Sequence, residues 1–173
     1  VTELVTGLDL VVEIDRSGVV INEWGSLGQE PFGERFERSV DYRKIATTKP
    51  HASHPNFVFE YGEEIWVSRF EQKDAICLTN PERRIDIGIE RPHDGVVRGN
   101  RVYFTTVDSH IVVANLDTLE VEDVIDLYAI AETDDALGWS RGLLIQDNVA
   151  IVGFSTLRIT KIRQNVRWVK ERF

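Results

Sequence analysis

Hydrophobic and polar residues alternate with a period of two along most of the chain, which is the pattern of β-strands. Near the N-terminus, LDLVVEID, RSG and VVINEW read as a strand, a Gly-containing turn and a second strand. From residue 56, four short strands are predicted by NFVFEYGEEIWVSRFEQKDAICLTNPERRIDIGI, with turns at YGEE, EQKD and NPER. Four more are predicted from residue 94 by DGVVRGNRVYFTTVDSHIVVANLDTLEVEDVIDL, and RGLLIQDNVAIVGFST adds a further pair. The pattern therefore predicts an all-β protein made of antiparallel strands.

The strands repeat at a nearly constant interval. Gly62 and Gly99, which occupy matching turns, are 37 positions apart, and the next matching strands start 47 positions apart, at Val102 and Val149. Four antiparallel strands in steps of about 40 residues are typical of the blades of a β-propeller. We expect four-stranded units at about 54–90 and 93–128, and about three and a half blades in a single domain spanning 1–173.

Two segments break this repeat. Residues 25–53 are Gly-rich and then charged, without alternation, and are expected to form an insertion between blades. At 160–173 the apolar residues Ile162, Val166 and Val169 fall at helical spacing, which predicts a short C-terminal helix. Helix is expected only in these two segments.

Three stretches resemble the blade-opening motifs of a known group of proteins: HPNFVFEYGEEIWVS, RPHDGVVRGNRVYFTT and GWSRGLLIQDNVAIVGFS. They resemble six-bladed β-propellers of the group that includes NHL repeats and gluconolactonase-like proteins, and together with RITKIRQNVRWVK they are similar to bacterial propeller proteins. The resemblance covers residues 54–173 and implies a closed ring of six blades. This chain would supply only part of such a ring.

An open arc of blades leaves an apolar face exposed at each end. Those faces are expected to include Val11, Ile21, Ile151 and Phe154. A large exposed apolar patch rarely persists on a monomer, so we expect these faces to be covered. The cover could be a second copy of the chain, the remainder of the propeller, or closure of the ring in which the first and last partial blades share one sheet.

Charge and composition narrow the possible partners and the compartment. The chain has 20 basic and 29 acidic residues, a net charge of −9, which argues against a nucleic acid partner. Cys77 is the only cysteine, so neither a disulfide framework nor a cysteine-based zinc site can form within the chain. No apolar stretch approaches the roughly 20 residues of a membrane span, and the N-terminus lacks the basic residues of a signal peptide. The sequence therefore predicts a soluble, cytoplasmic protein without a membrane partner.

The candidate site residues stand near the starts of the predicted inner strands. His54 and His93 are 39 positions apart, and His93 and Arg141 are 48 apart, both close to the repeat. Because the innermost strands of a propeller surround one channel, these side chains are expected to converge at its mouth, flanked by Asp94 and Trp139.

Three interpretations of this group remain open. His54 and His93 could ligate a divalent metal such as Zn or Ca, with a third ligand from Asp94, from His51 or from further blades. Alternatively, Arg141 and the two imidazoles could hold a carboxylate or phosphate of a small ligand. In the third interpretation these polar side chains only hydrogen-bond neighbouring blades.

Two functions follow from these interpretations. The first is a binding or scaffolding propeller that recognises a small ligand or a protein at the channel mouth or rim. The second is a metal-assisted lyase or hydrolase that uses the inner-strand histidines. The sequence leaves open whether the protein is an enzyme.

Overall fold

The computed structural model describes the chain except for residues 29–31, 33–34, 133–136 and 156–173. Its described part contains thirteen strands, one three-residue 3-10 helix and one five-residue α-helix, so the predicted all-β class is confirmed. The C-terminal helix expected at 160–173 lies outside the described residues. Among the helices that are described, none has the length and apolarity needed to cross a membrane.

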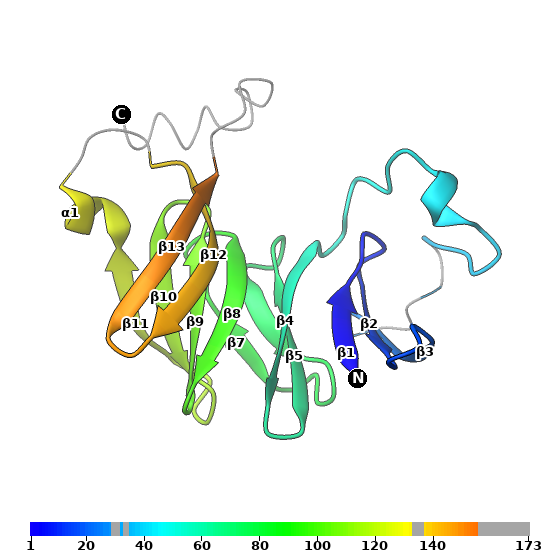
Figure 1. Cartoon of the computed structure of the whole chain (residues 1–173), viewed down its shortest axis with the longest axis horizontal. Helices are drawn as coiled ribbons and strands as arrows, with labels where there is room; N and C mark the ends of the chain where they lie inside the picture. Colours follow the sequence, from blue (N-terminus) through cyan, green and yellow to red (C-terminus); the bar gives the residue numbers. More distant parts are fainter. Residues whose placement is uncertain (29–31, 33–34, 133–136, 156–173) are drawn as a thin grey trace.

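Four antiparallel sheets follow one another along the chain (Figure 1). The first sheet consists of β1 (Thr2–Val5), β2 (Leu10–Ile14) and β3 (Val20–Gly25). The second consists of β4 (Pro55–Tyr61), β5 (Glu64–Arg69), β6 (Asp74–Cys77) and β7 (Arg84–Asp86). The third consists of β8 (Pro92–Arg98), β9 (Arg101–Thr106), β10 (His110–Asn115) and β11 (Val121–Asp126), and the fourth of β12 (Trp139–Gln146) and β13 (Val149–Ser155). The two four-stranded units thus form where the alternation predicted them.

The backbone repeats the same turns in successive sheets. The turn between the first and second strand of a unit contains a residue with positive φ in all three cases: Gly62, Gly99 and Asp147. The turn between the second and third strand of a unit also contains a residue with positive φ: Asp9, Lys73 or Ser109. By this correspondence, β1–β3 match the second to fourth strands of a four-stranded unit, and β12–β13 match the first two.

The helix α1 (Leu127–Ala131) was not expected at this position. It lies in the connection between β11 and β12, and this connection explains why the step between turns grows from 37 positions to 48, measured from Gly99 to Asp147. The Asp126 side chain starts the helix by accepting hydrogen bonds from the backbone N–H groups of Tyr128 and Ala129. The other helical element, η1 (Tyr42–Lys44), does fall in the 25–53 segment.

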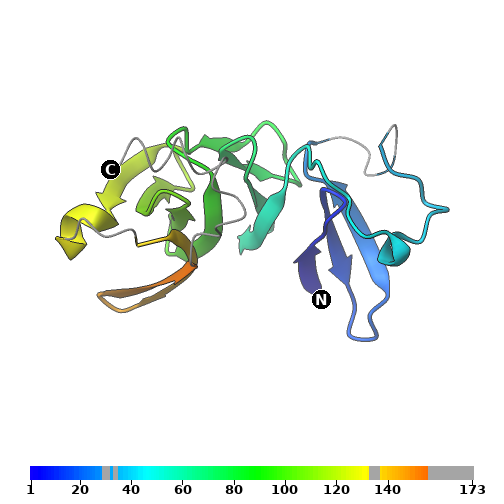
Figure 2. The same cartoon turned by 90° about the horizontal axis from the view of Figure 1, so that it is seen from above.

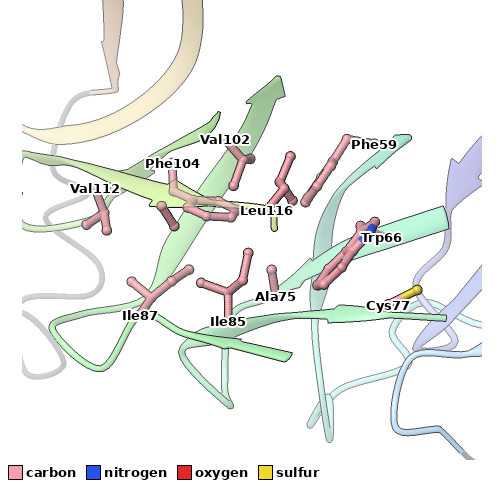
Figure 3. Packing of buried hydrophobic residues seen from close by; sticks show 11 residues of the cluster. Phe59, Trp66, Ala75, Cys77, Ile85, Ile87, Val102, Phe104, Val112 and Leu116 are labelled. Atoms are coloured by element: carbon pink, nitrogen blue, oxygen red, sulfur yellow. The ribbon is translucent and has the colours of Figure 1, made fainter. Parts of the chain in front are cut away.

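The main core lies between the second and third sheets (Figure 3). Trp66, Phe104 and Leu116 are fully buried there. Phe59 stacks on Trp66 with ring centroids 6.1 Å apart and meets Phe104 edge-on at 6.0 Å. These aromatic contacts join the two sheets and account for the burial of the apolar residues on their facing sides.

A second core joins the first and second sheets. Val67 follows Trp66 in β5 and points to the opposite face, because side chains alternate along a strand. It packs with Val11, Ile76 and Leu78. The β4–β7 sheet is therefore buried on both faces.

This packing corrects one expectation about the exposed end faces. Val11 is 0% exposed because it lies between two sheets, whereas Ile21 (47%), Ile151 (58%) and Phe154 (41%) are exposed as expected. Seen from above, the first sheet lies at one end of the molecule and the yellow segment with α1 at the other, while β12–β13 lies beside the third sheet (Figure 2). The first strands of the second, third and fourth sheets are neighbours, since β4 contacts β8, and β8 contacts β12.

A buried ion pair also ties the first two sheets together. The Arg69 guanidinium donates to both carboxylate oxygens of Asp74, at 2.8 and 2.6 Å, and its remaining terminal nitrogen donates to the Ser26 carbonyl at 2.9 Å. Asp74 is fully buried and also accepts from Arg84. Two guanidinium partners compensate the buried carboxylate for its lost hydration.

Gly95 sets how closely β4 and β8 approach. A Cβ at this position would lie 2.4 Å from Cδ1 of Phe59, which is packed in the main core. We expect Gly95→Ala to lower the free energy of unfolding by about 1–3 kcal/mol, as overpacking does. Chemical denaturation of Gly95→Ala, Phe59→Leu and the double variant checks this, since the smaller Leu side chain should relieve the clash. A double variant that loses as much stability as the two single variants together would contradict the contact.

Candidate functional site

The structure contains a cavity of about 500 Å³. It is lined by residues just before β4 and β8, by the start of β12, and by residues just after β5 and β9. Of the predicted site residues, His54, Trp139 and Arg141 line it. His93 lies close by, with its ring 5.4 Å from the ring of Phe70, which does line the cavity. The structure thus brings together residues that are up to 87 positions apart in the sequence, from His54 to Arg141.

The register of the site differs from the one inferred from the sequence. His54, Arg91 and Trp139 each stand eight positions before the positive-φ turn residue of their hairpin, and all three line the cavity. His93 and Arg141 stand six positions before theirs. His54 and His93 are therefore not equivalent. Sequence reasoning missed Arg91, although the spacing of 37 between Gly62 and Gly99 would have pointed to it.

Aromatic rings hold two arginine side chains at the cavity. The Arg91 guanidinium lies over the ring of Phe70, 5.3 Å from its centroid, and the Arg141 guanidinium lies over Trp139 at 5.2 Å. The same Phe70 ring contacts His54, with centroids 5.0 Å apart. Stacking of this kind restricts the orientation of a guanidinium group.

The first sheet positions the segment that carries the cavity histidines. Asp9, in the turn between β1 and β2, accepts hydrogen bonds from the backbone N–H groups of Ala52 and His54, both at 2.8 Å. Its carboxylate also pairs with Arg35 at 2.6 Å, and His51 Nδ1 lies 3.7 Å away. Asp9 thus fixes the backbone at His54 from a position 45 residues away in the sequence.

Both predicted histidines are held as neutral imidazoles at pH 7. Burial lowers the pKa of His93 from 6.5 to about 4, with help from the positive charge of Arg141 and from His54. Burial also lowers the pKa of His54, followed by the effect of nearby His51. His93 is only 9% exposed, and its Nε2 has no hydrogen-bond partner among the described residues.

The side chains do not form a donor set for a metal ion. The described part of the chain has no group of three or more His, Cys, Asp or Glu side chains that could hold one. His54 and His93 both pack on the apolar ring of Phe70. Of the proposed third ligands, Asp94 is engaged elsewhere, whereas His51 lies beside His54, with ring centroids 4.9 Å apart, and lines the cavity. The described residues alone therefore do not supply a complete ligand set for Zn or Ca at these two histidines.

Asp94 links the third and fourth sheets rather than lining the cavity. Its Oδ2 accepts a hydrogen bond from the Thr105 hydroxyl at 2.5 Å and from the Gly142 N–H at 3.0 Å. The residue is buried and has a positive φ of 62°. Among the predicted site residues, Asp94 thus makes the hydrogen bonds between neighbouring units that the third interpretation of the sequence describes.

Comparison with known protein families and with curated proteins gave no match for this chain.

The contacts of Asp94 predict different outcomes for two substitutions. Asp94→Ala removes the acceptor for the buried Thr105 hydroxyl and for the Gly142 N–H and places Ala at positive φ, so it should destabilise the fold by about 2–4 kcal/mol. Asp94→Asn keeps a side-chain oxygen and tolerates the turn, so it should cost about 1 kcal/mol or less. Thermal and urea unfolding of both variants checks the difference. Equal losses in the two variants would show that the acceptor is unimportant.

Burial of His93 also predicts a pH dependence of stability. The unfolded chain binds a proton at His93 with a pKa near 6.5, whereas the folded chain does so only near 4. The contribution of His93 to stability is therefore fully present above pH 6.5 and is lost as the pH falls towards 4, by about 3 kcal/mol in all. Urea unfolding between pH 7 and 4.5 should show a steeper loss for the wild type than for His93→Gln. Parallel curves would contradict a buried neutral His93.

Proposed function

We propose that the chain is part of a β-propeller and serves as a binding module that recognises a small ligand in the cavity between its first strands. One observation carries the proposal: three positions in the same register, His54, Arg91 and Trp139, line a single cavity although they belong to successive repeats. The cavity volume of about 500 Å³ suits a small molecule.

Several features support the propeller as its scaffold. Successive antiparallel sheets share the same turn conformations, and the first strands of neighbouring sheets contact one another. The three blade-opening stretches resemble those of six-bladed propellers. In a ring of this kind, binding sites form at the mouth of the channel from residues of several blades, as we propose for the cavity.

The exposed face of β12–β13 is consistent with a further blade packing against it. Leu144 and Ile151 are cross-strand partners and are 50% and 58% exposed. Val149, on the same face, is also exposed. In a complete ring, the next blade would cover this apolar face.

A metal-assisted lyase or hydrolase receives no comparable support. Among the side chains that the structure describes, no three metal donors gather. The cavity instead combines aromatic rings with N–H donors, which is the composition of a binding pocket.

A ligand screen tests the proposal. Neutral, cationic and anionic small molecules are screened for an increase in unfolding temperature, and hits are titrated against tryptophan fluorescence. A ligand in the cavity should change the emission of Trp139, and this change should vanish in Trp139→Phe, which keeps an aromatic wall. An unchanged response in Trp139→Phe would place the ligand elsewhere. If no class of molecule raises the unfolding temperature, the proposed function is wrong.

A further inference from the structure

The charge of the cavity wall is opposite to that of the chain. The whole sequence has a net charge of −9, yet among the described residues that line the cavity three are basic, Lys49, Arg91 and Arg141, and one is a carboxylate, Glu71. Three cations around one concave surface concentrate positive potential there, since the apolar walls screen it less than water does.

The two guanidinium groups approach the cavity from different sheets. Arg91 precedes β8 and stacks on Phe70, and Arg141 lies in β12 and stacks on Trp139. Each planar guanidinium has five N–H donors in a fixed geometry that matches a carboxylate or a phosphate. Two such groups, each stacked on an aromatic ring, provide a partly preorganised site for an anion.

The Arg91 guanidinium contacts two acidic residues, but these contacts are long and leave N–H groups that can donate to a ligand. Its nearest approach to Glu90 is 3.3 Å and to Glu71 is 3.9 Å. Charge-assisted hydrogen bonds between a guanidinium and a carboxylate are normally about 2.7–2.9 Å long. A ligand oxygen at that distance would therefore be a better partner than either glutamate.

We propose that the ligand of this cavity is a small organic anion whose carboxylate or phosphate group is bound by Arg91 and Arg141. This inference rests on the proposed function and specifies its ligand class. The aromatic rings of Phe70 and Trp139 form the apolar part of the wall, against which the carbon skeleton of the ligand packs. A cationic ligand would face repulsion from three side chains and attraction from one.

Isothermal titration of the whole chain at low ionic strength tests the ligand class. The probes are inorganic phosphate, citrate, the neutral molecule glycerol and the cation choline. We expect phosphate or citrate to bind and the other two not to bind. Binding of phosphate alone identifies a phosphate ligand, binding of citrate alone identifies a carboxylate ligand, and binding of both supports the shared chemistry.

Matched variants test the residues. Arg91→Gln and Arg141→Gln should each weaken anion binding about tenfold or more, since each removes charged hydrogen bonds. Arg98→Gln is the control, because Arg98 ends the same strand that Arg91 precedes and does not line the cavity. It removes the same charge and should leave binding within about twofold. Glu71→Gln should strengthen binding, because it removes a negative charge that lines the cavity.

The other outcomes would overturn the proposal in distinguishable ways. If glycerol or choline binds with the Trp139 response and the anions do not, the anion proposal is wrong and the proposed function stands. If no probe binds and the ligand screen also finds nothing, both are wrong. An equal loss of binding in Arg98→Gln and Arg141→Gln would indicate nonspecific attraction. Should Arg141→Gln fail to fold, Arg141→Lys replaces it: this variant keeps the charge but loses the two-pronged geometry, and unchanged binding would overturn the assignment.

Discussion

Burial of both faces of the β4–β7 sheet is the constraint on which the rest of the structure depends. Trp66 and Val67 are adjacent in β5 and pack into different cores, one shared with the third sheet and one with the first. Because the middle sheet is held from both sides, its neighbours cannot shift independently. The starts of β4 and β8 are thereby brought near each other, and β12 packs against β8 and β9 of the third sheet. The cavity forms between the residues just before β4 and β8, the start of β12 and the residues just after β5 and β9.

Buried aspartates complete this arrangement where apolar packing cannot. Asp9 belongs to the first sheet and binds backbone N–H groups just before β4, and Asp94 belongs to the third sheet and binds one in β12. Both occupy positions with positive φ, which a short polar side chain tolerates. These carboxylates organise the walls, whereas Arg91, Arg141 and Trp139 face the cavity itself. The polar residues near the strand starts thus have two separate roles.

Much of the fold could be predicted from alternation and turn residues, because both act locally. The four-stranded units and the shorter units at each end follow from this local pattern. The helix α1 was missed, since a five-residue helix has too few turns to produce a clear apolar period. The role of Asp9 could not be predicted, because it depends on contacts across 45 positions. Arg91 was overlooked because a charged residue beside Glu90 and Pro92 looks like an ordinary surface turn.

His54, Arg91 and Trp139 occupy the same position relative to the turn of their hairpins, which has a consequence for how the ligand preference of such a protein can evolve. Three copies of one backbone position carry an imidazole, a guanidinium and an indole, while the alternating apolar residues that hold the sheets together lie elsewhere on the strands. Each copy can therefore be exchanged without disturbing the cores. A lineage built from duplicated repeats could in this way alter its chemical preference combinatorially, one sheet at a time, on an unchanged scaffold.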